Sequence, residues 1–357
     1  MSARNSKSFV LALLLAVVAS ISLPSMPAFS QQPSGSATQP AQTAPPNRAT
    51  GQSAVQAGSN GTFTFRTSVS EVVLYATVID GHQKLVTSLT SQNFSVYENN
   101  VLQKISSLSQ QDVPVSMGIL VDNSGSMAGK RAAVNRAAID LVRASNPQDE
   151  AFIVNFSDEA YLDQDFTSNV GLLEKGLSHI DSAGGTALYD SVIAAADHLA
   201  KHAQHPKQVI LIITDGEDNS SGTTLAQTVR RVQDLNGPIV YSIGLLYDEP
   251  NGQGGRQARK ALQTLSDETG GIAFFPKNLD HVDAIAGEVA RDIRHQYIIG
   301  YHPTQPISQG GYRAIRLDAK AKGLGKLTVR TRAGYFANPS TTQSVPPNAA
   351  QPASSHP

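Results

Sequence analysis

The chain has 357 residues, of which 40% are hydrophobic and 16% charged, and its formal net charge at pH 7 is −1. This length allows one large domain or two modest domains, each with its own core. The chain contains no cysteine, which excludes disulfides and cysteine-linked lipid anchors and leaves oxygen and histidine as metal ligands. No basic tract interleaved with aromatic residues occurs, so nucleic acid is excluded as an expected partner.

The first thirty residues are typical of a signal peptide. Arg4 and Lys7 supply a basic start, Phe9–Leu23 an apolar core, and Ala28-Phe29-Ser30 a cleavage site of small residues. An uncleaved membrane anchor is the alternative, but the apolar run is short for a spanning helix. We therefore expect export to the periplasm, the cell surface or the medium, with no membrane span after cleavage. Residues 31–60 are rich in Ser, Ala, Gln, Pro and Thr, which predicts a disordered linker.

Residues 61–110 form the next segment, and their pattern is that of β-strands. Val72–Val78 is rich in β-branched and aromatic residues, and Asp80-Gly81 marks a turn after it. Further strands are predicted at Phe94–Tyr97 and Ile105–Leu108. These strands are too few to close a stable sandwich alone.

Residues 113–296 alternate between strand and helix patterns. Strands are predicted at 113–121, 151–156, 209–213, 239–245 and 272–275, and helices from 130 and at 170–180, 187–203, 224–235, 257–269 and 282–293. Such alternation predicts an α/β fold with a doubly wound, mostly parallel sheet and helices on both faces. The apolar run Val209–Ile213 supports this fold, because strands of a parallel sheet are buried on both faces.

Residues 297–337 return to a β pattern, with strands predicted at Tyr297–Tyr301, Tyr312–Ala319 and Leu327–Phe336. We hypothesise that this segment pairs with residues 61–110 in one small β domain, into which the α/β domain is inserted. Residues 338–357 have the composition of the linker, and we expect them to be disordered.

A group of oxygen-bearing side chains lies where the first strand of the α/β segment gives way to a helix. Asp122, Ser124 and Ser126 alternate there on a Gly-containing turn. Their oxygens can point into one small volume, and oxygen ligands suit a hard divalent cation such as Mg²⁺. The turn also lies at the carboxyl end of a strand, where open α/β sheets place their ligands.

Two further loops supply oxygens that can reach the same edge of the sheet. Thr186 ends the Gly-rich stretch 181–186 at the start of a helix, and Asp215 directly follows the buried strand at 209–213. Each motif also has an ordinary interpretation, as a helix cap or a turn. Three such loops in one order favour a metal site with Asp122, Ser124, Ser126, Thr186 and Asp215 as its residues.

With these residues, the stretch from Val113 to Gln296 resembles the von Willebrand factor A-type (VWFA) family. The metal-ion-dependent adhesion site of that family is Asp-x-Ser-x-Ser followed by a distant Thr and a distant Asp, and all five positions match here. The resemblance implies that the three hydroxyls contact the metal directly and that the two aspartates act largely through water. The flanking stretches SVYENNVLQKI and YIIGYHP to TRAGYF resemble an exported VWFA-related family described from acidobacteria.

The resemblance implies an exported adhesion module that binds a protein partner through Mg²⁺, or through Mn²⁺ or Ca²⁺. A cation held mainly by neutral hydroxyls retains its attraction for one more hard oxygen, so we expect the partner to offer an acidic side chain. We expect no enzymatic activity. Asp190 is interpreted as a capping or solvated acid, and Glu217 and Asp218 as charges on the rim of the site.

Two alternatives remain open at this point. An aspartate after a buried strand is also found in Mg²⁺-dependent phosphatases of the haloacid-dehalogenase type, but these carry Asp-x-Asp, and Ser124 occupies the third position here. The chain could also contain a structural domain whose metal site is inactive.

Overall fold

The computed structural model describes residues 56–57, 63–64, 71–179, 182–248 and 252–337. The predicted signal peptide, most of the predicted linker and the C-terminal tail at 338–357 lie outside these residues. Gln56–Ala57 (β1) and Phe63–Thr64 (β2) pair as antiparallel strands within a unit that ends at Arg66. No helix in the described ranges is long and apolar enough to cross a membrane.

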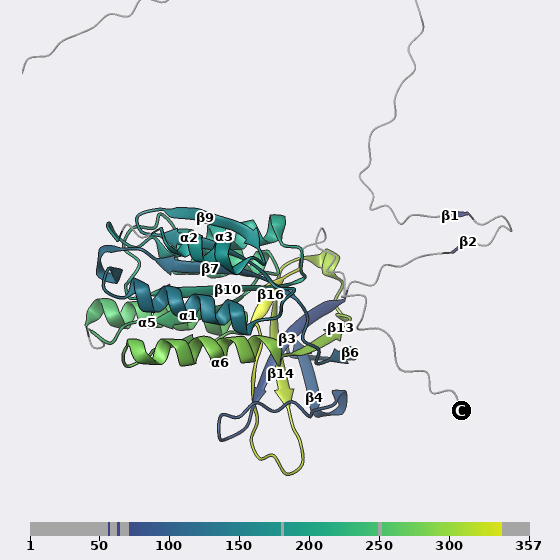
Figure 1. The fold of residues 1–357 in the computed structure, drawn as a ribbon. Coiled ribbons are helices and arrows are strands. Elements are labelled where there is room, and N and C mark those ends of the chain that lie inside the picture. The colour runs from purple at the N-terminus through teal and green to yellow at the C-terminus, as the bar shows by residue number, and fades with distance from the viewer. Residues whose placement is uncertain (1–55, 58–62, 65–70, 180–181, 249–251, 338–357) are drawn as a thin grey trace, which may run out of the picture. The chain divides into compact units, whose positions relative to one another are not determined.

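The α/β part of the chain is built on a six-stranded sheet with the strand order β12-β11-β10-β7-β8-β9 (Figure 1). Neighbouring strands are parallel, except that β9 runs antiparallel to β8 at one edge. The strands of this sheet are β7 (Val115–Asp122), β8 (Glu150–Phe156), β9 (Ala160–Thr167), β10 (Lys207–Thr214), β11 (Ile239–Gly244) and β12 (Ala273–Phe274).

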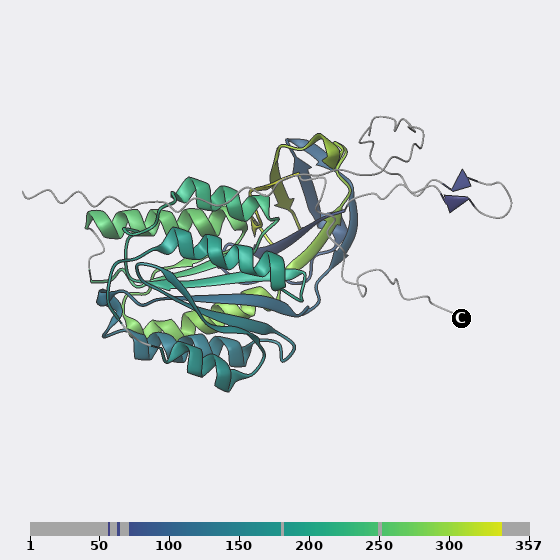
Figure 2. The same ribbon diagram turned by 90° about the horizontal axis from the view of Figure 1, so that it is seen from above.

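Helices cover both faces of this sheet, as Figure 2 shows. One face packs against α1 (Arg131–Ala144), α2 (Val170–Leu177) and α6 (Val282–Arg294). The other face packs against α3 (Leu188–His202), α4 (Leu225–Asp234) and α5 (Gln253–Thr269). Short 3-10 turns complete the helical elements: η1 (Ser91–Asn93), η2 (Gly125–Met127), η3 (Leu279–His281) and η4 (Ile307–Gln309).

Strand β10 shows why the sheet needs both helical layers. Its residues Val209, Leu211 and Ile213 enter one core, while Ile210 and Ile212 enter the other. All of them are fully buried, and each contributes about 1.5–3 kcal/mol of hydrophobic stabilisation. An uninterrupted apolar run therefore fits a strand that is covered on both faces.

The segments before and after the α/β part form a β-sandwich of two four-stranded sheets, ordered β15-β3-β13-β6 and β16-β14-β4-β5. Each sheet combines strands from both segments, for example through the antiparallel pair β3 and β13. The strands are β3 (Val72–Ile79), β4 (Phe94–Glu98), β5 (Val101–Gln103), β6 (Ile105–Ser109), β13 (Tyr297–Tyr301), β14 (Tyr312–Ala319), β15 (Thr328–Arg330) and β16 (Gly334–Phe336). The predicted fold class, with a β domain built from the flanking segments, is confirmed.

A buried carboxylate ties the two segments of the sandwich together. Glu98 on β4 forms an ion pair with Arg313 at 3.1 Å, and both side chains are at most 2% exposed. The same carboxylate accepts hydrogen bonds from the hydroxyls of Tyr301 (2.7 Å) and Tyr335 (2.9 Å). These three partners come from β14, β13 and β16, so the acid of the first segment is satisfied only when the second segment is in place.

The strands of the structure differ from the predicted strands at β5, at β9 and at the last predicted strand. The short strand β5 was not predicted, although it pairs with β4. The edge strand β9 was not predicted, because its sequence is polar and its residues are largely exposed, so it lacks the apolar run by which buried strands are found. The single strand predicted at Leu327–Phe336 is wrong. The chain crosses there from one sheet to the other, and β15 and β16 pair with β3 and β14 respectively.

Polar side chains are buried where the sandwich meets the α/β part. Asp292 at the end of α6 pairs with Arg330 of β15 at 2.7 Å and accepts a hydrogen bond from the hydroxyl of Tyr241, also at 2.7 Å. Lys207, at the start of β10, donates to the carbonyl of Ile293, and its ammonium lies 5.3 Å from the ring centre of Tyr75 on β3. Burial lowers the pKa of Lys207 to about 8.

This buried lysine makes stability depend on pH. The pKa of Lys207 is about 8 in the folded chain, against 10.5 for an ordinary lysine, so the unfolded chain binds more protons between these values. The free energy of unfolding therefore gains a contribution as pH rises through this window. The variant Lys207→Met lacks that contribution, and its stability relative to the parent should fall by about 3 kcal/mol between pH 7 and 11. Denaturant titrations at several pH values measure this difference, and parallel pH profiles would contradict it.

Candidate metal centre

The turn after β7 places Asp122 at the carboxyl edge of the sheet. Its side chain is 0% exposed. One carboxylate oxygen accepts from the amide of Ser124 at 2.8 Å, and the other accepts from the hydroxyl of Thr214 at 2.5 Å. Thr214 ends β10, which runs parallel to β7, so the pairing of the two strands brings these residues together.

The environment of Asp122 opposes its negative charge. Burial raises the pKa of the Asp122 carboxyl above its ordinary value, although the hydrogen bonds from Thr214 and Ser124 act in the opposite direction. Arg131, at the start of α1, brings one buried positive charge near it, and burial lowers the pKa of that guanidinium to about 10. A cation at the edge of the sheet would favour the ionised form of Asp122 further.

Ser124, Ser126 and Asp215 meet directly. The two serine hydroxyls lie 3.2 Å apart, and that of Ser126 donates to Oδ1 of Asp215 at 2.7 Å. The Asp215 side chain is 1% exposed. The structure therefore brings residues from the first and third predicted loops into contact.

Thr186 joins the group through the second loop. Its amide donates to Oδ1 of Asn219 at 2.8 Å, and its carbonyl accepts from the amide of Asn219 at 3.0 Å. The Thr186 hydroxyl lies so close to Gly216 that a Cβ there would come within 3.3 Å of it. Glycine after Asp215 thus keeps space beside the hydroxyl. The first loop is tied to the second by a hydrogen bond from the amide of Ala183 to the carbonyl of Asn123 (3.1 Å).

The donor set fits a hard divalent cation. It consists of two almost fully buried carboxylates and three hydroxyls, which are the oxygen ligands that Mg²⁺ and Mn²⁺ accept. Within the described ranges no three His, Cys, Asp or Glu side chains gather into a metal cluster. Any site at this edge therefore depends on the hydroxyls as well as the carboxylates.

Two charged residues at this edge were missed by the sequence analysis. Lys130 forms ion pairs of 2.7 Å with Oδ2 of Asp215 and Oδ2 of Asp248. Burial acts to lower the pKa of Lys130, but the hydrogen bonds to Asp215 and Asp248 outweigh it and raise the pKa above its ordinary value. Lys130 could have been found from its position, four residues after Ser126. Asp248 follows β11, and only the strand order places it here.

These side chains line a cavity of about 430 Å³. Its walls include Ser126, Lys130, Asp215 and Asp248, and Gly254 and Gly255 at the start of α5 contribute backbone. The cavity gives a ligand access to the edge of the sheet beside Asp215.

Glu217, interpreted above as a rim charge, lines the cavity, whereas three other acidic residues near the site bind the protein's own loops. Asp190 accepts from the amides of Gly222 and Thr223, as a capping residue does. Although burial opposes it, these bonds and that from the Thr223 hydroxyl hold the pKa of Asp190 below its ordinary value. Asp218 accepts from the amide of Tyr189 and the hydroxyl of Ser221, so it orders the third loop and is no free rim charge. Asp158, which was not predicted, accepts from the amide of Gly185 at 2.8 Å.

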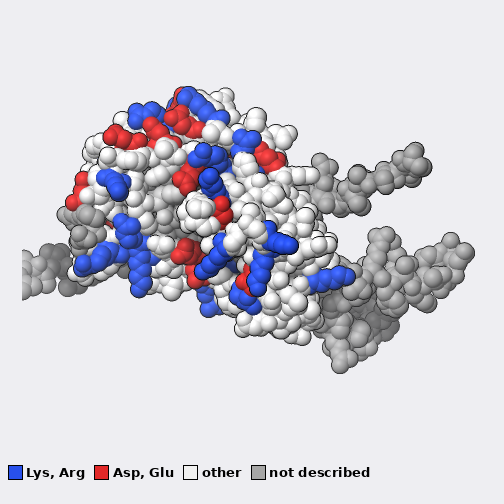
Figure 3. Space-filling view, turned by 90° about the horizontal axis from the view of Figure 1, so that it is seen from below, with Lys and Arg blue, Asp and Glu red and all other residues white. Residues whose placement is uncertain are grey.

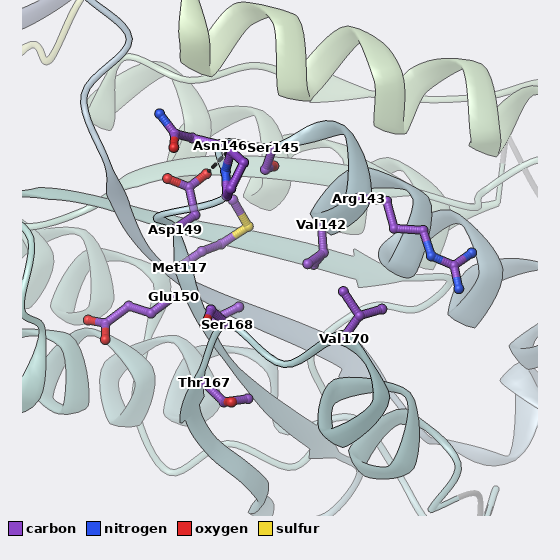
Figure 4. A pocket seen from close by; sticks show the side chains of 12 residues that line it. Met117, Val142, Arg143, Ser145, Asn146, Asp149, Glu150, Thr167, Ser168 and Val170 are labelled. Carbon is purple, nitrogen blue, oxygen red and sulfur yellow. Dashed lines mark hydrogen bonds between the residues drawn. The ribbon is translucent and has the colours of Figure 1, made fainter.

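A second cavity, of about 340 Å³, lies between the end of α1, the start of α2 and the first residues of β7 and β8 (Figure 4). Its acidic residues are engaged within the chain. Asp149 accepts from the amides of Val115 and Asn146, and Glu150 accepts from the hydroxyl of Ser116. The candidate metal centre lies at the other ends of these strands, where β7 and β10 finish.

Charge is mixed over one face of the molecule. On the face shown in Figure 3, acidic and basic side chains are interspersed. Ion pairs such as Arg136–Asp283 and Arg143–Glu174 connect neighbouring helices across the surface.

Comparison with known families finds a match within the α/β part. Residues 117–217 match the family model described as von Willebrand factor type A domain, which confirms the resemblance over that range. All five candidate residues lie within it, and the β-sandwich lies outside. A comparison with curated proteins finds no match.

Several solved structures are similar in their chain trace. An aerotolerance-related membrane protein from Bacteroides fragilis is 19% identical, with a TM-score of 0.42, over 50% of this chain and 98% of its own. A von Willebrand factor type A protein from Catenulispora acidiphila is 14% identical, with a TM-score of 0.44, over 76% of this chain and 75% of its own. The vWF domain of the type V pili tip protein Mfa5 from Porphyromonas gingivalis is 12% identical, with a TM-score of 0.42, over 51% of this chain and 95% of its own.

Proposed function

We propose that this protein is an exported adhesion module that binds an acidic protein partner through a divalent cation. Asp122, Ser124, Ser126, Thr186 and Asp215 would hold the cation. The observation that carries this proposal is the convergence of three loops at one sheet edge, where Ser126 bonds Asp215 at 2.7 Å beside the buried Asp122. The family match over 117–217 supports it.

The residues around the site have distinct tasks. Thr214 and the amide of Ser124 orient Asp122, while Ser126 and Lys130 hold the two oxygens of Asp215. When bound, Mg²⁺, Mn²⁺ or Ca²⁺ supplies a Lewis-acidic position for a carboxylate oxygen of the partner. The three hydroxyls are neutral, so all the negative charge of the donor set comes from its two carboxylates.

Binding is favoured over catalysis at this site. A phosphatase of the haloacid-dehalogenase type needs a carboxylic acid two residues after its nucleophile, and that position holds Ser124, whose hydroxyl lies 3.2 Å from that of Ser126. We therefore assign no enzymatic activity to the site. Export follows from the predicted leader, which lies outside the described residues.

The first prediction of the proposed function concerns the ligands of the cation. Thr186→Val keeps the shape of the side chain but removes its hydroxyl, and Asp122→Asn removes a buried charge. Both variants should fold and lose Mg²⁺ affinity by about tenfold or more, because each deletes a ligand or its electrostatic support. Isothermal titration with Mg²⁺ and Mn²⁺ measures this, with Thr264→Val, which removes a hydroxyl from exposed helix surface, as the matched control.

The alternatives have their own outcomes in the same titration. A parent protein that binds neither ion would indicate a structural domain with an inactive site. Variants at Thr186 and Asp122 that titrate like the parent would show that the ligands are assigned wrongly.

The second prediction concerns the partner. A protein captured from the envelope fraction should be released by EDTA and bound again when Mg²⁺ is restored, because the cation joins the two surfaces. Pull-down with the parent and with Thr186→Val in parallel measures this dependence. A complex that survives EDTA would locate the interface elsewhere, for example on the β-sandwich.

A further inference from the structure

Lys130 has two carboxylate partners in very different settings. Asp215, whose side chain is 1% exposed, belongs to the edge of the sheet and is also held by Ser126. Asp248, whose side chain is 61% exposed, lies on the chain that follows β11. Both carboxylates lie 2.7 Å from the ammonium. One partner is therefore built into the site, whereas the other reaches it from solvent.

The ammonium itself is well fixed. The Lys130 side chain is 14% exposed, and its nitrogen lies 5.3 Å from the ring centre of Tyr247. A fixed, half-desolvated charge binds an anion more strongly than an exposed lysine does, because less side-chain entropy is lost and water screens the pair less.

Asp248 can be displaced from this position at low cost. The Asp248 side chain is 61% exposed, so its carboxylate regains water when it leaves Lys130, and this hydration offsets part of the lost ion pair. The cavity beside it has a volume of about 430 Å³ and is lined by Gly254 and Gly255 at the start of α5. Gly254 and Gly255 add no side chains of their own, although the carboxylate of Glu217 lies beside Gly254 in the same wall. The positive end of the 17-residue helix α5 favours an anion there.

We propose that Lys130 is the residue that receives the partner's carboxylate, and that Asp248 is an internal carboxylate that occupies this place until the partner arrives. The inference rests on the proposed function, because it gives the acidic partner a second positive contact in addition to the cation. Asp248 then sets the affinity, since each partner molecule has to displace it. The apparent dissociation constant of the partner is the intrinsic constant divided by the fraction of molecules in which Asp248 is away.

Acetate serves as the probe, with acetamide as its neutral counterpart. Acetate is titrated into the Mg²⁺-saturated, ¹⁵N-labelled protein at constant ionic strength, and the amide shifts of Lys130, Gly254 and Gly255 report binding. Asp248→Asn should bind acetate about threefold more tightly or better, because the competitor is gone. Lys130→Met should bind it about tenfold more weakly, because a charge-assisted hydrogen bond is lost.

Mg²⁺ affinity, measured separately by calorimetry, gives the readout that a structural role would not produce. Asp248→Asn changes a residue that contacts none of the five candidate ligands, so it should bind Mg²⁺ as the parent does. Lys130→Met is compared with the parent at its own Mg²⁺ saturation, because Lys130 also holds one oxygen of Asp215. The control is Asp197→Asn, which removes an equally charged partner of Arg231 on the α3–α4 surface and should behave as the parent.

The outcomes separate this inference from the proposed function. A parent that binds no Mg²⁺ overturns the proposed function and the inference with it. A parent that binds Mg²⁺ but whose acetate affinity is unchanged in Asp248→Asn or in Lys130→Met overturns only the inference. Opposite shifts of acetate affinity in the two variants, with Mg²⁺ binding retained, support it.

Discussion

The buried carboxylate of Asp122 is the interaction on which the site depends. A charge at the edge of a packed sheet is unfavourable unless hydrogen bonds and nearby cations compensate for the lost water. Here Thr214, the amide of Ser124 and the charge of Arg131 provide part of that compensation. These contacts offset part of the free energy that burial of the carboxylate costs. The hydrogen bond between Thr214 and Asp122 also brings two loops together, because Asp215 directly follows Thr214.

The sandwich holds the two ends of the α/β part. Strand β6 leads into β7, and α6 leads into β13, so both crossings lie at the same junction. The pair Asp292–Arg330 and the buried ammonium of Lys207 connect this junction to α6 and β10. Such buried polar groups are satisfied only in one arrangement, which makes the orientation of the sandwich against the sheet specific.

The sequence allowed most of the fold to be predicted, because apolar periodicity reflects burial directly. The run Val209–Ile213 predicted a strand covered on both faces, and β10 is one. Polar elements were missed for the same reason: β9 carries little apolar signal, and the break between β15 and β16 depends on which sheet each strand joins. In the candidate site, motif spacing located the oxygens. Lys130 and Asp248 could not be paired from spacing, since only the order of β11 beside β10 brings Asp248 to Lys130.

The two edges of the central sheet restrict how this protein can associate. At one edge β12 has only two residues, and at the other β9 carries Asp163 and Asp165, which are engaged with His179 and His198. Short and charged edge strands discourage a second sheet from adding to the first. Polymers that extend this sheet from molecule to molecule are thereby disfavoured. Selective association then depends on the side chains of the loops.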